Sequence, residues 1–149
     1  MSNPYFAQLE NKVKSLLGSQ AENEWLQQQT WRSIANYSQE EVYELIDAIE
    51  RADIPAIKDE LADWCFHLLI YAEMGRRDGH FCLEDIAHAA LQKLTERHAA
   101  DKVSSEEAHL HWQKEKYQEK HKLTGSILSD VPMALPALLH ANKLLDAAK

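Results

Sequence analysis

Apolar side chains recur at every third or fourth position along most of this sequence, and this spacing is the feature that most restricts its fold. Val42, Leu45 and Ile49 illustrate it in the middle of the chain, and Leu9 and Val13 near its beginning. Such spacing places apolar side chains on one face of an α-helix. No segment shows the period-two alternation that is typical of a β-strand. The chain is therefore predicted to be all-α, and its 149 residues suit one domain.

Start and stop signals divide the helical pattern into segments. Ser38 precedes Glu41 by three positions, which is the spacing of a capping box, and Asp53 is the expected N-cap of a helix with Pro55 in its first turn. Residues 19–29 are polar and rich in Gln, and are predicted to be a loop. The expected helices cover residues 1–18, 30–35, 38–52, 54–77, 83–99, 105–121 and 137–148. We expect a helical domain at 1–122 and a C-terminal tail with a short helix at 123–149.

The charge of the chain restricts its partners. The sequence has 24 acidic and 16 basic residues and a formal net charge of −8, which disfavours nucleic-acid binding. Two cysteines cannot make a disulfide framework. No apolar run approaches the ~20 residues that cross a membrane, and no basic-then-apolar segment opens the chain, which favours a cytoplasmic location.

Two pairs of acidic residues carry the chemical signal. Glu60 and Asp63, followed by His67, form one stripe on the expected helix 54–77, which is otherwise apolar on nearly every side. Glu41 and Glu44 are also three positions apart and share a face of the preceding helix. The short connection between the two helices predicts an antiparallel hairpin. Four carboxylates on facing helices suit a hard divalent cation such as Mg²⁺ or Mn²⁺.

Simpler interpretations of these residues stay open. Glu41 could be the reciprocal partner of Ser38 in the capping box, Glu44 a solvated helix charge, and Glu60 a residue at an exposed entry to the core. A carboxylate-bridged di-iron bundle would need Glu-x-x-His pairs on two helices. Glu106 with His109 is the one such pair, on a polar segment, so this interpretation ranks low.

The acidic segments resemble the EExxE…ExxD signature of the MazG nucleoside triphosphate pyrophosphohydrolases, in a single-domain form. Glu40-Glu41-Val42-Tyr43-Glu44 and Glu60-Leu61-Ala62-Asp63 carry the signature. Further segments resemble the family in the same order: Gln29-Thr30 with Ser33-Ile34, residues 43–49, residues 93–98, Trp112 with Lys116, and parts of 126–143.

The resemblance implies a fold and an activity. The fold is an antiparallel four-helix-bundle-like domain with extra terminal helices, and the activity is hydrolysis of an NTP or dNTP to a monophosphate and pyrophosphate. It implies a metal site at Glu41, Glu44, Glu60 and Asp63, with Mg²⁺ as the cofactor and Mn²⁺ as a substitute. It further implies catalytic roles for Glu40, Glu41 and Glu44.

Substrate contacts and assembly are also implied by the resemblance. Lys93 and Arg97 would meet the phosphates, Trp112 the base, and Lys116 would complete the substrate-binding set. Without the resemblance, an equally good interpretation is that Lys93 and Arg97 are solvated charges at the end of a helix. Trp112 could equally well be a packing contact with another helix. A homodimer or a dimer of dimers is expected, because residues 6–17 and 83–94 leave apolar surface to cover. The alternative function is a non-catalytic module of the same fold that binds metal or nucleotide.

Overall fold

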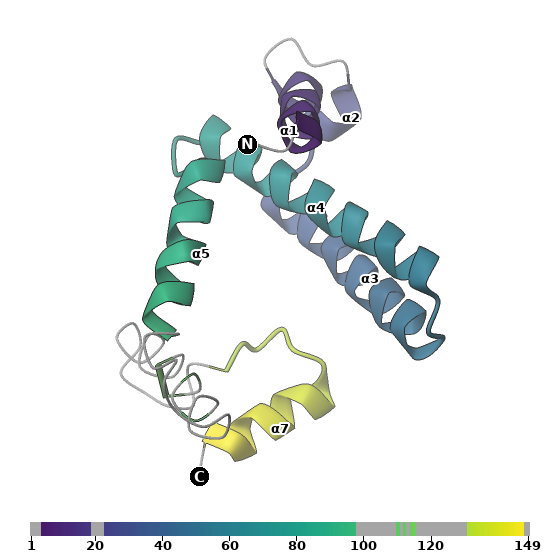
Figure 1. Ribbon diagram of the computed structural model, residues 1–149, viewed down its shortest axis with the longest axis vertical. Helices are drawn as coiled ribbons and strands as arrows, with labels where there is room; N and C mark the ends of the chain where they lie inside the picture. Colours follow the sequence, from purple (N-terminus) through teal and green to yellow (C-terminus); the bar gives the residue numbers. More distant parts are fainter. Residues whose placement is uncertain are drawn as a thin grey trace. The chain divides into compact units, whose positions relative to one another are not determined.

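Helices make up nearly all of the ordered structure in the computed structural model, which describes residues 4–18, 23–97, 110, 112, 114–115 and 131–147. In this part of the chain there is no β-strand, so the predicted all-α class is confirmed. The chain divides into two compact units, residues 1–88 and 89–149, which are described separately. The helices are α1 (Pro4–Leu17), α2 (Glu24–Gln27), α3 (Trp31–Glu50), α4 (Ile54–Arg77), α5 (Leu83–Arg97) and α7 (Ala137–Ala147) (Figure 1).

Helices α3 and α4 form the predicted antiparallel hairpin, in which they run side by side (Figure 1). A short turn at residues 51–53 joins them, with Ala52 at a positive φ of 53°. Asp53 is the N-cap of α4, and its Oδ1 accepts a hydrogen bond of 3.1 Å from the backbone N–H of Ala56. Pro55 lies in the first turn, where a missing N–H costs nothing. The predicted start and end of α4 are therefore confirmed.

The start of α3 was predicted wrongly. The structure has one continuous helix over Trp31–Glu50, not two helices at 30–35 and 38–52. The capping box belongs to Thr30 and Ser33: the Ser33 N–H donates to Thr30 Oγ1 (3.2 Å) and the Thr30 N–H to Ser33 Oγ (2.9 Å). Ser38 lies inside the helix, where its hydroxyl donates to the Ile34 carbonyl at 3.0 Å. No Gly or Pro interrupts residues 31–50, so the helix continues.

Other boundaries follow the sequence to different degrees. The segment predicted as a loop contains the short helix α2, whose N-cap Asn23 accepts a hydrogen bond from the Leu26 N–H. Helices α1, α5 and α7 correspond to the segments expected at 1–18, 83–99 and 137–148. Most of the expected helix 105–121 and the expected boundary at 122–123 lie outside the described residues. None of the helices in the described ranges is long and apolar enough to cross a lipid bilayer.

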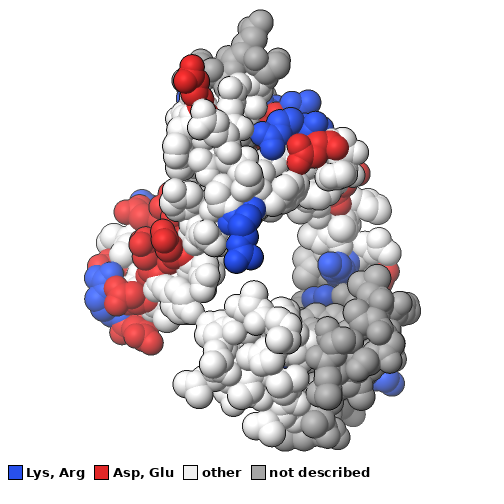
Figure 2. All heavy atoms as spheres, turned by 180° about the vertical axis from the view of Figure 1, so that it is seen from behind, with Lys and Arg blue, Asp and Glu red and all other residues white. Residues whose placement is uncertain are grey.

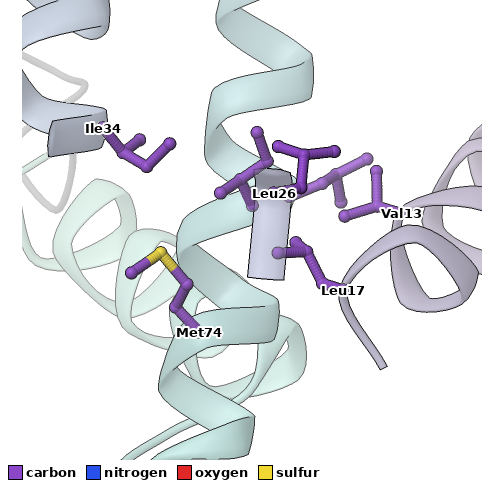
Figure 3. Close-up of a cluster of buried hydrophobic side chains, with 7 residues drawn as sticks. Val13, Leu17, Leu26, Ile34 and Met74 are labelled. Carbon is purple, nitrogen blue, oxygen red and sulfur yellow. The ribbon is translucent and has the colours of Figure 1, made fainter. Parts of the chain in front are cut away.

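The core lies at one end of the hairpin. Helix α1 packs there against α4 and against the short α2, and Ile34 of α3 contributes to the same cluster of buried side chains (Figure 3). The N-terminal half of α4 has less cover, and Ile54 and Leu61 are exposed. The sequence of α4 is apolar on nearly every side, but its buried residues all lie in its second half. The buried apolar cluster consists of Val13, Leu17, Leu26, Ile34, Leu69, Ile70 and Met74.

A close contact fixes the corner after α4. The carbonyl of Gly75 accepts hydrogen bonds from the N–H groups of His80 (2.9 Å) and Phe81 (3.4 Å). The Phe81 ring then lies against Gly75, where an added Cβ would be 2.4 Å from Cε2 of that ring. Gly75 is thus needed for its small size, because a methyl group overlaps the ring.

We predict that Gly75→Ala destabilises the protein by ~1–3 kcal/mol through overpacking against Phe81. Helix propensity alone predicts the opposite, a gain of about 1 kcal/mol. Thermal unfolding of Gly75→Ala, Phe81→Leu and the double variant measures the coupling between the two positions. The double variant should recover part of the loss, and a simple sum of the two single effects would contradict the contact.

Candidate metal centre

Three acidic side chains of the hairpin meet in the structure. Glu41 comes from the middle of α3, and Glu60 and Asp63 come from the facing part of α4. One carboxylate oxygen from each lies within 4.8 Å of the others. Glu41 and Glu60 are half-buried, and Asp63 is exposed. The structure thus brings together three of the four residues expected to hold a metal.

The fourth expected ligand, Glu44, lies one helical turn after Glu41. Its side chain is exposed and is not one of the three that converge, although its charge acts on Glu41. Glu40 is exposed next to Glu41. The metal-binding role of Glu44 and the catalytic roles of Glu40, Glu41 and Glu44 remain predictions.

One of the simpler interpretations does not fit this geometry, whereas the exposed side chain of Glu44 agrees with a solvated helix charge. Glu41 is not part of a capping box, because that box belongs to Thr30 and Ser33. Asp63 is exposed, so the apolar residues beside it in the sequence do not bury it. The Glu106–His109 pair lies outside the described residues.

The surroundings of Glu41 favour its neutral form. Burial raises the pKa of Glu41 above the ordinary value of 4.5, and the charges of Asp63, Glu44 and Glu60 raise it further. The carboxyl group of Glu60, with which a protonated Glu41 can share its proton, acts in the same direction. The metal-free site therefore stabilises a retained proton on Glu41.

Two carboxylate oxygens in this cluster lack partners. Glu41 Oε2 and Glu60 Oε2 are buried, and no donor among the described residues reaches them. Glu73 on the same helix shows the opposite case, because this buried carboxylate accepts a 2.8 Å hydrogen bond from Arg76 Nε. Buried carboxylates are normally paired or coordinate a metal. The unpartnered oxygens at Glu41 and Glu60 thus fit a hard divalent cation.

The local charge supports the same assignment. Between residues 40 and 63 the chain has nine acidic and two basic side chains. One of the two basic residues, Arg51, bonds Asp47 (2.8 Å) and Asp53 (3.2 Å) at the turn. Figure 2 shows the acidic side chains gathered over the hairpin. The field of this surface attracts cations.

The residues expected to bind substrate lie in the second unit. Lys93 and Arg97 are one helical turn apart near the end of α5, where Lys93 is exposed and Arg97 half-buried. The Arg97 guanidinium carbon lies 4.8 Å from the centroid of the Trp112 ring, within the range of a cation–π contact. Sequence analysis did not anticipate this pairing. Lys116 lies outside the described residues.

Ser38 is a neighbour of the acidic cluster that the sequence pattern does not reveal. Its spacing from Glu41 was interpreted as a capping signal, but three positions also place two side chains on one helix face. Ser38 is buried and bonds His67 across the hairpin. His67 was recognised as part of the acidic stripe, and the structure places it in the interior.

The raised pKa of Glu41 predicts a pH-dependent loss of stability in chelator. The folded state keeps a proton on Glu41 that the unfolded state releases near pH 4.5, so this group's contribution to stability is lost as pH rises from there through the folded-state pKa. Glu41→Gln lacks this titration. Melting curves should show the wild type losing stability relative to Glu41→Gln as the pH rises above 4.5, whereas a constant difference would contradict the assignment.

The segment that contains this hairpin matches a known protein family. Residues 29–100 match the model of the MazG nucleotide pyrophosphohydrolase domain. The nucleoside triphosphate pyrophosphohydrolase of Escherichia coli (strain K12) is 37% identical over 126 residues, covering 80% of this chain and 48% of that protein. A protein of the same name from Mycolicibacterium smegmatis is 34% identical over 128 residues, covering 81% of this chain and 40% of that relative.

A third relative agrees with these two. The nucleoside triphosphate pyrophosphohydrolase/pyrophosphatase MazG of Thermotoga maritima is 32% identical over 126 residues, covering 84% of this chain and 49% of that protein. The chain spans about half the length of the curated relatives it matches. The matched domain contains the whole acidic cluster, and the resemblance seen in the sequence is confirmed. The chain belongs to the MazG family.

Proposed function

We propose that this protein hydrolyses nucleoside triphosphates, NTPs and dNTPs alike, to the monophosphate and pyrophosphate in a Mg²⁺-dependent reaction. The observation that carries the proposal is the group of three carboxylates, with two buried and unpartnered oxygens, inside the segment that matches a pyrophosphohydrolase domain. The names of the relatives support the reaction class.

Charge explains why the proposed reaction needs a cation. A triphosphate is an anion, and it approaches a chain whose net charge is −8 through a surface crowded with carboxylates. Glu41, Glu44, Glu60 and Asp63 would hold Mg²⁺, with Mn²⁺ as a substitute. When bound, the cation neutralises charge on the phosphate oxygens. Phosphoryl transfer depends mostly on positioning and charge stabilisation, so the protein's main task is to orient the substrate.

The proton balance assigns a task to the carboxylates. Water attacks the α-phosphorus, the bond to the bridging oxygen of the β-phosphate breaks, and pyrophosphate leaves with the electron pair. The attacking water loses a proton, which a nearby base must accept. Glu40, Glu41 and Glu44 are the proposed candidates for this base.

The phosphate and base contacts are proposed for the second unit. Lys93 and Arg97 would bind phosphates, with Arg97 able to make bidentate contacts that a lysine does not copy. Trp112 would contact the base, and Lys116 would complete this set. The cation–π contact of Arg97 with Trp112 supports the idea that the two side chains act together.

A measurement of pyrophosphate release tests the proposed reaction. The eight common NTPs and dNTPs are each incubated with the full chain and Mg²⁺, with and without chelator. Release of pyrophosphate and monophosphate in equal amounts, abolished by chelator, is the expected result. The alternative is a non-catalytic module of the same fold that binds metal or nucleotide without turnover, which the carboxylate cluster alone would also allow. Nucleotide binding without turnover would establish the alternative.

Asp63→Asn separates a metal site from a structural role. We expect hydrolysis to fall by orders of magnitude, because the substitution removes a ligand charge. Stability in chelator should stay equal or rise, because Asp63 raises the pKa of Glu41 through charge repulsion. Saturating Mg²⁺ at 100 times its dissociation constant should stabilise the wild type by ~2.7 kcal/mol and the variant much less. Equal destabilisation of Asp63→Asn with and without Mg²⁺ would argue against the metal site.

We further infer that the protein is a homodimer or a dimer of dimers, in which two hairpins form a four-helix arrangement. Ile54, Leu61 and Leu68 are spaced by seven positions along α4, and they are 71%, 53% and 40% exposed. Ile46 and Ile49 on α3 are also exposed, at 44% and 55%. A stripe with this spacing is typical of a helix that packs against another helix.

Self-association is predicted at micromolar concentration. Sedimentation equilibrium should give a dimer or tetramer for the wild type, and Leu61→Arg should shift it towards the monomer by placing a charge in the apolar stripe. Asn36→Arg is the matched control, because Asn36 is an exposed polar residue of α3 outside the stripe. A monomeric wild type would contradict the inferred assembly.

A further inference from the structure

A buried polar contact joins the two helices beside the acidic cluster. Ser38 Oγ lies 3.1 Å from His67 Nδ1 and 3.0 Å from the hydroxyl of Tyr71, both on α4. The same oxygen lies 3.0 Å from the Ile34 carbonyl on its own helix. Ser38 and His67 are only 8% and 7% exposed. The site proposed above leaves this contact without a role.

Only one placement of protons makes all three contacts hydrogen bonds. A serine hydroxyl has one proton to donate and two lone pairs that accept. The Ile34 carbonyl can only accept, so the Ser38 proton points to it. Tyr71 must then donate its hydroxyl proton to Ser38 Oγ, and His67 must donate from Nδ1. The three contacts therefore require a proton on His67 Nδ1. Because burial disfavours the charged imidazolium, we assign His67 as the neutral Nδ1–H tautomer, with Nε2 unprotonated.

The surroundings support a neutral imidazole and a fixed Tyr71. Burial lowers the pKa of His67, and the charge of Asp63 opposes this effect. The Tyr71 ring stacks on Trp31, with centroids 5.9 Å apart and planes at 16°. Trp31 Nε1 in turn donates a 2.9 Å hydrogen bond to Asp78 Oδ2. These contacts hold the Tyr71 hydroxyl where it meets Ser38.

The contact lies one helical turn from the acidic cluster on each helix. Ser38 precedes Glu41 by three positions on α3, and His67 follows Asp63 by four positions on α4. Residues at these spacings are neighbours on one helix face, with Cβ atoms about 5–6 Å apart. The hydrogen bond between Ser38 and His67 thus joins α3 to α4 next to the acidic cluster.

We propose that Ser38 is a positioning residue, which fixes His67 in its Nδ1–H form and sets the separation of α3 and α4 where Glu41 faces Glu60 and Asp63. The positioning role rests on the proposed function, because its purpose is to shape the metal site. The three converging carboxylates repel one another across the hairpin, and a buried bond between the helices opposes this. A neutral His67 adds no positive charge beside Asp63, so the cluster keeps its negative charge for a cation.

The first experiment measures the tautomer directly. Full-length protein containing ¹⁵N-labelled histidine is studied in chelator by ¹H–¹⁵N correlation spectroscopy, which distinguishes protonated from unprotonated ring nitrogens. His67→Gln identifies the signal. The wild type should show Nδ1 protonated and Nε2 unprotonated at neutral pH. A wild-type His67 protonated on Nε2 would overturn the assignment, and this measurement needs no altered Ser38.

The second experiment compares Mn²⁺ affinity by calorimetry in wild type, Ser38→Ala, Ser38→Thr and Ser33→Ala. Groups beyond the ligands of a metal site change metal affinity by roughly 10–100-fold. Ser38→Ala should weaken Mn²⁺ binding by at least about tenfold on that scale, and Ser38→Thr, which keeps the hydroxyl, should restore most of it. Ser33→Ala is the matched control, because it removes a hydroxyl from the capping box of α3 and lowers stability away from the cluster.

The outcomes separate this proposal from the proposed function. If Ser38→Ala binds Mn²⁺ as the wild type does, the positioning role is overturned while the metal site stands. If Ser33→Ala weakens Mn²⁺ binding as much as Ser38→Ala at equal loss of melting temperature, the effect is general destabilisation and the role is also overturned. A wild type that binds no Mn²⁺ would overturn both the metal site and the positioning role, and leave the tautomer to the first experiment.

Discussion

Electrostatic repulsion among carboxylates on two facing helices is the constraint on which the rest of this structure depends. Glu41, Glu60 and Asp63 converge although each carries the same charge when ionised, and this raises the pKa of Glu41. Such a cluster costs stability unless a proton or a cation compensates it. Contacts elsewhere in the chain must therefore hold α3 against α4. Two carboxylate oxygens of the cluster, on Glu41 and Glu60, meanwhile have no hydrogen-bond donor among the described residues.

The contacts that hold α3 against α4 lie on either side of the acidic cluster, at the two ends of the hairpin. The buried apolar cluster unites α1, α2, the first turns of α3 and the second half of α4, and Asp53 caps α4 at the turn. The acidic residues lie between these two fixed points, where the hairpin has little cover. This arrangement is common at functional sites, where local cost is balanced by stability from the scaffold around them.

Local signals in the sequence were sufficient for some features and insufficient for others. Asp53 and Pro55 define the start of α4 by short-range chemistry, and the i, i+3 spacing of Glu60 and Asp63 places both on one face. The start of α3 was missed because Ser38 and Glu41 imitate a capping box, while the true box at Thr30 has Ser33 instead of Glu or Gln. What Ser38 does depends on His67, which lies 29 positions away. The exposure of Asp63 could not be predicted either, because it depends on which helices cover α4.

The short turn at Asp53 has a consequence for how the site forms. Glu41 and Asp63 are 22 positions apart, and a single short turn connects the two helices that carry them. Bringing them together closes a small loop at low entropic cost, and contacts of short sequence separation form rapidly in folding. The proposed cation site is therefore formed by residues that are close together in the sequence. Its carboxylates come together when the hairpin forms.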